Sequence, residues 1–425
     1  MLPQTADQRR AIRALSACPG FKRLWVGQLL SQIGDQCLLI AAITLISDLS
    51  RSPLAMLIPV ISMIAPQIAF GLMGGVLADR WDRKAIMIVA DVLRGLIVLS
   101  VMWVGQARDL WILYLVAASL AMLGVFFYPA RNAAIPNLVP PDLLMTANGM
   151  VQASYIIALI VGPAIAGPVV QLWGAPAAAG FDSATFFVSA IMIATIYIPS
   201  IARQQHRAID ERKASVWQDM QAGLHFIRHN RPLLQTMTIT AFATLGVGAI
   251  VLLAVPHLKQ ELEAGGLQYG FAMSMLGLGS VLGGIVVNRL SRHFLASTLV
   301  AGLLILAGAA IVLFAYAPSY LAVLFSVAVL GMCVVIARGA LETIIQALTP
   351  DYMRGRVQST VNLLVVSSTA VAEGLFAVLG SVFEVQKVFL AAGALTALAG
   401  VAAAFTLRTA ARLAAGPPIL GDVQP

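Results

Sequence analysis

Charged residues are scarce in this chain of 425 residues. Asp, Glu, Lys and Arg together make up 11% of it, and 60% of it is apolar. Soluble domains usually carry about 25% charged residues, so this composition, with a mean hydropathy of +0.89, excludes an ordinary soluble globular protein. Cysteine is equally rare. Cys18, Cys37 and Cys333 are too few and too scattered for a disulfide framework or a zinc site, and we expect them to be small packing residues.

Several chemical motifs are also missing from the sequence. No segment has the form GxxxxGK[ST] that holds nucleotide phosphates, and no metal-ligand cluster or nucleophile triad is apparent. We therefore expect no enzyme, no ATP hydrolysis by this chain, no cofactor and no metal. The net charge of +8 comes from basic residues spread over short polar stretches, so we expect no nucleic-acid partner. The first apolar run, at about 24 residues, is too long for a signal peptide, and we interpret it as a first membrane span.

Long apolar runs fill most of the chain. A run of about 20 residues in a helix crosses the roughly 30 Å of hydrocarbon in a bilayer. We therefore predict an all-α polytopic membrane protein with 12 transmembrane helices. The expected spans are 24–47, 53–77, 85–105, 110–130, 147–171, 179–199, 233–256, 268–287, 296–316, 319–338, 358–382 and 387–407.

An internal repeat relates the two halves. The stretch from Gly74 to Lys84, two glycines followed by a dense cluster of charges, returns in weaker form from Gly283 to His293, an offset of 209 residues (283 − 74). Pro141-Asp142 and Pro350-Asp351 keep the same offset. Two six-helix bundles that are parallel repeats of each other would explain why the same offset separates both pairs of motifs.

The polar segments set the expected domains and orientation. We predict an N-terminal segment 1–22, a bundle 23–199, a linker 200–232, a second bundle 233–407 and a tail 408–425. If the N-terminus is cytoplasmic, 22 of the 27 basic residues fall on the cytoplasmic side, Arg338 among them. The positive-inside rule then predicts that both termini are cytoplasmic. We expect the protein in the inner membrane of a bacterium. Within the linker, residues 215–231 are either an amphipathic helix on the membrane surface or a loosely ordered connection.

Three stretches resemble a known family. The sequence Gly75-Val-Leu-Ala-Asp79-Arg80-Trp-Asp-Arg83-Lys84 resembles the signature loop between spans two and three of the major facilitator superfamily, with Asp82 in place of the usual second glycine. Ala158 to Gly167, with Gly162 and Pro163, resembles the span-five motif of its antiporters. Phe126 to Pro140, Ala147-Asn148 and Arg354-Gly355-Arg356-Val357 are similar to the exporter branch that contains macrolide efflux proteins and the enterobactin exporter.

This resemblance implies an efflux protein that exports a small organic molecule, of the drug or siderophore class, by proton antiport and rocking of the two bundles. Its partners would be that small-molecule substrate, protons and membrane lipids, and we expect a monomer. Many drug–proton antiporters carry an arginine in span four, whereas this chain has none between Trp111 and Ala130. Two alternatives stay open: a lipid or lysolipid facilitator, and a membrane sensor or assembly subunit that does not transport.

Polar residues inside the spans are candidate site residues, because charges in hydrocarbon are costly. Four stripes at helical spacing are expected to line a water-filled cavity between the halves. They are Gln28, Gln32 and Asp35; Asn148, Gln152 and Tyr155; Thr236, Thr240 and Thr244; and Asn362, Thr369 and Glu373. Asp35 is the first candidate for the proton-coupling residue and Glu373 the second, and a buried structural hydrogen bond is the alternative for each. The threonines could instead bond back to their own helices.

A cytoplasmic gate is expected around the signature loop, with Asp79 facing the start of the span at 358–382. Its members would be Gly75, Asp79, Arg80, Arg83, Asp91 and Arg94. Asp91 and Arg94 are spaced i, i+3 and should form a structural pair near the cytoplasmic end of their span. Asp182 is expected as an interfacial helix cap, and Ser280 with Gly284 as a small-residue contact on span eight.

Overall fold

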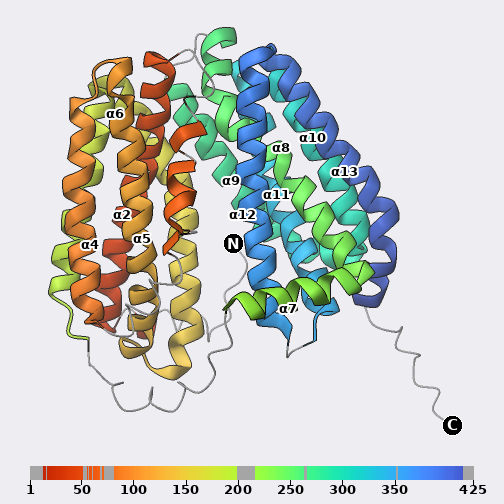
Figure 1. Ribbon diagram of the computed structural model, residues 1–425, viewed down its shortest axis with the longest axis horizontal. Coiled ribbons are helices and arrows are strands. Elements are labelled where there is room, and N and C mark those ends of the chain that lie inside the picture. The colour runs from red at the N-terminus through yellow and green to blue at the C-terminus, as the bar shows by residue number, and fades with distance from the viewer. Residues whose placement is uncertain are drawn as a thin grey trace. The chain divides into compact units, whose positions relative to one another are not determined.

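The computed structural model describes residues 13–15, 17–50, 55, 57–59, 61–67, 69–70, 81–198, 216–262, 266–350 and 353–414. Within these ranges every regular element is a helix, which confirms the all-α prediction (Figure 1). The chain divides into two compact units. The first comprises Met1–Ile209 and Val255–Gly277, and the second Asp210–Ala254 and Leu278–Pro425. The predicted bounds of the two bundles and the linker stay predictions.

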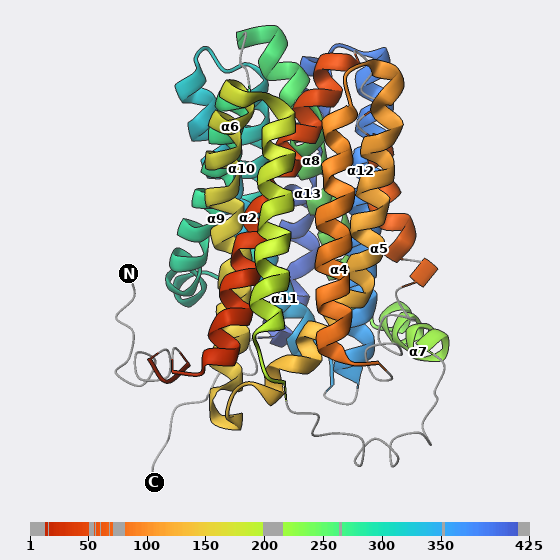
Figure 2. The same cartoon turned by 90° about the vertical axis from the view of Figure 1, so that its left-hand side faces the viewer.

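The first unit is built on α2 (Pro19–Leu49) and α6 (Leu144–Ala194), which pack together along their length. The helices α4 (Arg83–Val98) and α5 (Leu110–Ala134) complete it, with short 3-10 helices at Leu99–Trp103, Ala107–Asp109, Ile135–Asn137 and Pro141–Leu143. Figure 2 shows α2, α4, α5 and the two arms of α6 running side by side. Large side chains such as Phe21 and Phe127 fill the interior of this unit.

The second unit is organised around α10. This helix (Ala296–Ala315) packs against both α11 (Tyr320–Leu348) and α13 (Val385–Ala414). The other helices are α7 (Val216–His229), α8 (Arg231–Leu262), α9 (Gly266–His293) and α12 (Arg354–Val382). The last turns of α8 and the first half of α9 belong to the first unit.

Ten helical segments among the described residues are long and apolar enough to cross a membrane. One of them, Pro141–Ala194, has 54 residues and would be about 80 Å long if it were straight. Gly174 breaks it, with φ of 79° and ψ of 174°, a backbone conformation that glycine adopts easily. The two arms of α6 therefore account for two of the expected spans. Most of the turn residues around the expected second span, 71–80 included, lie outside the described residues.

The signature loop is therefore only partly visible. Gly75, Asp79 and Arg80 lie outside the described residues. The two residues that follow Trp81 have clear structural roles. Asp82 caps the start of α4, where its side chain accepts a hydrogen bond from the backbone nitrogen of Ala85 at 2.7 Å. Arg83 donates to the carbonyl oxygen of Ala133 at 2.8 Å and so joins the start of α4 to the C-terminal end of α5, where a positive charge is favourable.

The small-residue contact on α9 uses Ser280 of the expected pair, whose hydroxyl donates to the carbonyl oxygen of Gly331 on α11 at 3.4 Å, together with two neighbouring glycines. A Cβ atom on Gly283 would lie 2.7 Å from the carbonyl oxygen of Met332, and Gly279 approaches the backbone of Ala328 as closely. A Cβ atom on Gly284 would meet nothing within 4 Å. The prediction of Gly284 was wrong because sequence spacing gives a helical face but not its direction. Gly279 and Gly283, spaced i, i+4, let α9 and α11 touch backbone to backbone.

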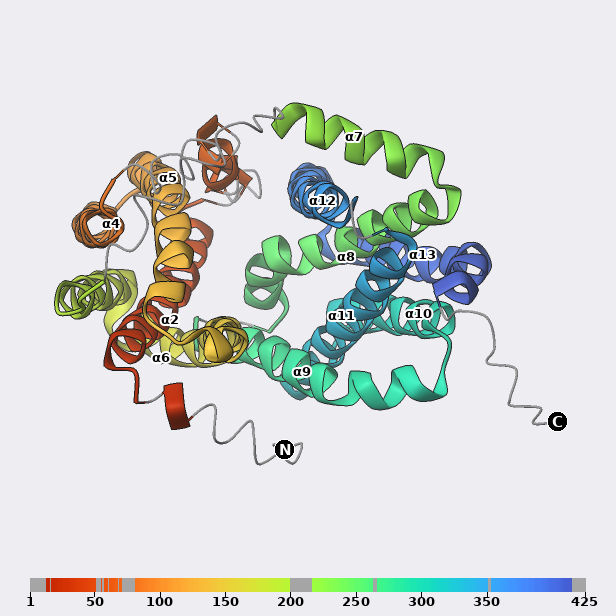
Figure 3. The ribbon, with the colours of Figure 1, turned by 90° about the horizontal axis from the view of Figure 1, so that it is seen from below.

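The amphipathic helix of the linker exists as α7. Its side chain Ile227 is buried in a cluster with Leu233 of α8 and with Met353 and Val357 near the start of α12. Seen from below, α7 runs past the end of α12 before it joins α8 (Figure 3). Part of the apolar face therefore packs on the second unit, whereas Leu224 is exposed.

Candidate functional site

The polar stripe of α2 points into the first unit. Gln28 is buried and donates a hydrogen bond of 3.4 Å to the hydroxyl of Ser189 on the second arm of α6. Gln32 is half-buried, and its oxygen has no hydrogen-bond partner among the described residues. Asp35, one turn further on, is also half-buried. This stripe therefore faces α6, and its Gln28 end is enclosed by protein.

Arg94 and Asp91 form the expected pair at the centre of this unit. Their side chains are 3.6 Å apart, and their exposed fractions are 6% and 0%. Ser189 donates to the other carboxylate oxygen of Asp91 at 2.7 Å, so Gln28, Ser189, Asp91 and Arg94 form one chain of contacts. Both residues lie in the middle of the span Arg83–Trp103. Their position relative to the cytoplasmic side of the membrane stays a prediction.

Aromatic side chains cover the guanidinium of Arg94. Its central carbon lies 4.8 Å from the centre of the Phe127 ring, and the rings of Tyr128 and Phe186 are also within cation–π range. Its Nε atom has no hydrogen-bond partner among the described residues. Arg94 is therefore held by one carboxylate and by ring faces, and still has an unused donor.

Asp182 is the third carboxyl of the cluster. It is fully buried on the second arm of α6, where Thr185 contacts one of its oxygens at 3.5 Å. It lies against Gly34, next to Asp35, and interacts electrostatically with Asp35 and Arg94. The expected interfacial cap was wrong, because Asp182 lies eight residues (182 − 174) beyond the break at Gly174 and is fully buried. We call Asp35, Asp91, Asp182 and Arg94 the acidic cluster.

The acidic cluster combines three carboxyls with one guanidinium: Asp91 pairs with Arg94, and Asp35 and Asp182 interact with it electrostatically. Asp35 also interacts electrostatically with Asp91. One oxygen of Asp91 and one of Asp182 have no hydrogen-bond partner among the described residues. With every group ionised, the cluster would carry a charge of −2 inside a membrane-spanning unit. Such an arrangement is expensive in hydrocarbon and is typical of sites that bind and release protons.

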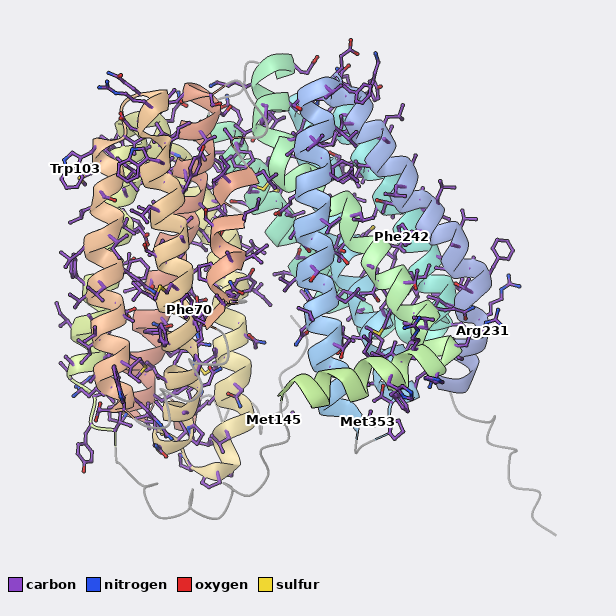
Figure 4. The ribbon with its side chains drawn as sticks, in the orientation of Figure 1. Phe70, Trp103, Met145, Arg231, Phe242 and Met353 are labelled. Carbon is purple, nitrogen blue, oxygen red and sulfur yellow. The ribbon has the colours of Figure 1, made fainter. Side chains whose placement is uncertain are left out.

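The polar stripe on the first arm of α6 is exposed, unlike the buried Gln28 end of the α2 stripe. Asn148, Gln152 and Tyr155 are all exposed in the first unit. Met145, at the start of this arm, is also largely exposed (Figure 4). Their exposed face is open to water, lipid or another part of the protein, and cavity lining stays a prediction for it.

The span-five motif sits at close helix contacts. Gly162 packs against Gln36 of α2, and a Cβ atom there would lie 3.2 Å from the carbonyl oxygen of Ile33. Gly270 of α9 packs against the backbone at Pro163 and Gly167. The glycines of this motif therefore let the first arm of α6 touch α2 on one side and α9 on another.

The second unit contains a cavity of about 200 Å³, which we call the C-unit cavity. It is bounded by α8, α10, α11, α12 and α13, and most of its wall is aliphatic, with Leu304, Ile311, Leu330 and Val334 among the lining residues. Its polar lining residues are Thr240, Thr244, Arg338, Glu342, Asn362, Thr369 and Thr396. Concave, mostly apolar cavities with a few polar groups are the usual form of small-molecule sites.

The threonines bond back to their own helices, which was one of the two roles that sequence left open; the lining of a cavity between the halves stays a prediction. The hydroxyls of Thr240 and Thr244 donate to the backbone oxygens of Thr236 and Ala241 at 2.9 and 2.7 Å, and Thr369 bonds back to its own helix in the same way. These three still line the C-unit cavity. Thr236 is buried, bonds to the carbonyl of Pro232, and does not line it.

Glu373 lies behind the cavity wall. It is buried on α12, and its Cγ would lie 3.5 Å from a Cβ atom placed on Gly248, a lining residue of α8. Its carboxyl is therefore close to the cavity without forming its surface. Proton coupling by Glu373 stays a prediction.

Arg338 was taken from sequence as the last residue of the span 319–338, on the cytoplasmic side; that end of the helix was wrong, and the side of the membrane stays a prediction. It lies within α11, ten residues (348 − 338) before the helix ends at Leu348. The apolar run seemed to stop at Arg338 because a charge was taken as its boundary, yet Gly339 to Leu348 continue the helix. The i, i+4 spacing of Arg338 and Glu342 followed by Ile344 and Ile345 was the signal that could have indicated this.

A metal site has no support in the described residues, where no three His, Cys, Asp or Glu side chains converge closely enough to hold an ion.

The sequence of this chain is similar to those of known membrane transporters. The family model of the Major Facilitator Superfamily matches residues 24–372 and 236–421. The chain is 30% identical over 304 residues to YfiS of Bacillus subtilis (strain 168), an uncharacterised MFS-type transporter, covering 67% of this chain and 68% of YfiS. It is 24% identical over 385 residues to macrolide efflux protein A of Streptococcus pyogenes, covering 88% and 93% of the two chains.

Solved structures share the fold. A bacterial homologue of the iron transporter ferroportin, crystallised in an inward-facing state, superposes with a TM-score of 0.69. The alignment covers 92% of this chain and 98% of the homologue at 14% identity. At this identity the likeness concerns the fold alone.

Proposed function

Because this chain belongs to the Major Facilitator Superfamily, we propose that it exports a small organic molecule across the cytoplasmic membrane in exchange for protons. Relatives that are efflux proteins favour the outward direction. In this proposal the two halves rock around a substrate that is exposed first to one side of the membrane and then to the other.

The C-unit cavity supports an organic cargo. Its aliphatic wall would hold an apolar body, and its few polar side chains would orient that body. The same features suit a lipid or lysolipid, so a facilitator for such molecules is the second candidate. The two candidates differ in whether transport proceeds uphill.

The acidic cluster carries the proton part of the proposal. Three carboxyls interact with one guanidinium in a membrane-spanning unit. Holding protons relieves the excess negative charge, and releasing them restores it, so the cluster has the chemistry of a reversible proton site. Asp35 is half-buried as a residue, whereas Asp91 and Asp182 are fully buried, and we assign to Asp35 the exchange of the proton with water.

Asp35→Asn tests this assignment. The amide keeps the size of the side chain and most of its hydrogen bonds but cannot take up a proton at ordinary pH. The cargo is first identified by comparing secretion and drug sensitivity of cells with and without this gene. Purified protein is then reconstituted in liposomes with the labelled cargo. We expect the variant to exchange cargo down a gradient and to lose accumulation driven by an imposed pH difference.

Glu384→Gln is the matched control, because Glu384 is an acidic residue exposed beside the start of α13. It should pump like the unchanged protein. Uphill transport by Asp35→Asn at the rate of the unchanged protein would place the proton elsewhere, with Glu373 as the next candidate. Cargo movement that never responds to a pH difference would favour a facilitator, and no movement at all would favour a sensor or assembly subunit.

A further inference from the structure

The strongest unexplained feature of the second unit is a positive charge inside its cavity. Arg338 lines the C-unit cavity and is exposed. It lies about 15 Å along the axis from the end of α11 at Leu348. Arg338 therefore lies inside the segment Tyr320–Leu348, which is long and apolar enough to cross a membrane.

No side chain in the described part of the chain pairs with this guanidinium. Its neighbours Ile336 and Ala337 are buried against other helices, whereas Arg338 points into the cavity. Arginine offers five donors and never loses its charge under physiological conditions. Inside a membrane protein such a group is almost always paired or bordered by a watery pathway, and it marks function.

The other charged residue on the cavity wall, Glu342, forms no ion pair with Arg338 in the described part of the chain. Glu342 lines the cavity one turn further along α11 and accepts a hydrogen bond from Gln346 at 3.3 Å. No ion pair of 4 Å or less joins Glu342 to Arg338 among the described residues. Glu373 lies behind the wall of α12. From the facing helix, Asn362 contributes a neutral amide. Among the described lining residues, the cavity therefore presents one guanidinium that is in no ion pair, together with one carboxylate, beside a largely aliphatic wall.

We propose that the C-unit cavity binds an amphiphile whose oxyanion, a carboxylate or a phosphate, pairs with Arg338 while its apolar part lies among the aliphatic residues. A planar guanidinium matches either oxyanion with two parallel hydrogen bonds. The amide of Asn362 can donate a further bond. This inference rests on the proposed function, because it names the chemical class of the exported molecule.

A cysteine in the cavity provides the test. Val365 lines the cavity and is apolar, so Val365→Cys leaves every polar lining residue in place. Of the native thiols, Cys37 and Cys333 are fully buried, and only the less enclosed Cys18 needs the replacement Cys18→Ser. The neutral reagent N-ethylmaleimide then labels position 365 in purified protein. Octanoate, octyl phosphate, octylamine and octanol are compared as protecting probes.

We expect octanoate or octyl phosphate to halve the labelling rate at a concentration about 10-fold lower than octanol does. Arg338→Gln should abolish that difference, whereas Arg338→Lys should keep much of it. Arg231→Gln is the matched control, because Arg231 is an exposed arginine at the start of α8, in the same unit but outside the cavity (Figure 4). It should change nothing. Protection by octanoate alone would indicate an organic acid, and protection by octyl phosphate alone a lipid-like headgroup.

Stronger protection by octylamine, or equal protection by all four probes, would overturn the inference. A preference for oxyanions that survives Arg338→Gln would do so too. If Arg338→Gln does not fold, Arg338→Lys and Glu342→Gln decide, since the first should keep the preference and the second strengthen it. The labelling needs no gradient, so a protein that binds these probes without transporting would contradict the proposed function and leave this inference standing.

Discussion

At the scale of single residues, the acidic cluster depends on Arg94. Among the described residues, Arg94 pairs with Asp91, interacts electrostatically with Asp35 and Asp182, and lies under the Phe127 ring. A buried ion pair adds little net stability compared with apolar residues, whereas removing one partner leaves an uncompensated buried charge. Substitutions of different members of the cluster should therefore change the free energy of unfolding by very different amounts.

Arg94→Gln should lower the free energy of unfolding by about 3–5 kcal/mol, because three carboxyls would lose their common counter-charge. Asp182→Asn should change it by less than about 1 kcal/mol, because Arg94 keeps Asp91 as its partner. Both effects can be measured by denaturant titration of the purified variants. The double variant should regain part of the stability that Arg94→Gln loses. Equal losses for the two single variants would contradict a cluster centred on Arg94.

At the scale of elements, the sequence predicted some of the residues that make close helix contacts but not which helix they meet. The motif of Gly162, Pro163 and Gly167 was recognised, but its partner Gly270 was not. Spacing along one helix says nothing of which helix it meets. For the same reason Asp182 was taken for a surface residue, and its burial against α2 became evident only from the packing of α6.

Gly270→Ala should destabilise the contact between α9 and the first arm of α6. The added Cβ atom would lie 2.8 Å from the Cα atom of Gly167 and closer still to the carbonyl oxygen of Pro163. Both are backbone atoms that cannot turn aside, so the helices must separate. We expect a loss of about 1–3 kcal/mol, measured as a lower midpoint of thermal unfolding.

Gly284→Ala on the same helix is the control for that measurement. Nothing lies within 4 Å of its added Cβ atom, and alanine favours the helix. Its midpoint should stay level or rise. If the two variants behaved alike, the close approach of α9 to α6 would not matter for stability.

At the scale of the whole molecule, hydropathy and charge were sufficient to predict the class of protein. They were insufficient to predict where some helices end and how the helices group into units. The apolar runs correctly gave an all-helical chain with many membrane spans. They did not give the length of α11, because the charges of Arg338 and Glu342 looked like the end of the helix although a cavity makes those charges tolerable inside it. They also did not indicate that the end of α8 and the first half of α9 group with the N-terminal part of the chain.

One ion pair connects the end of α8 to the end of α2. Lys259, near the end of α8, contacts Asp48, near the end of α2. Both side chains are about half exposed, so the pair itself is worth no more than about 1 kcal/mol. Its interest is its position, because it joins residues 211 apart in sequence. Both lie in the first compact unit, but they belong to different predicted bundles, 23–199 and 233–407, which the proposed rocking would separate and rejoin.

A covalent link at this point should therefore stop transport. In Asp48→Cys with Lys259→Cys, oxidation should form a disulfide that halts cargo movement, and a reductant should restore it. The linked pair Glu384→Cys with Lys387→Cys is the control, since these residues are three apart at one end of α13 and cannot join distant segments. Each single cysteine should also leave transport unchanged. Transport by fully cross-linked protein at the rate of the reduced form would show that α2 and α8 stay together throughout the cycle, and rocking at this end would have to be abandoned.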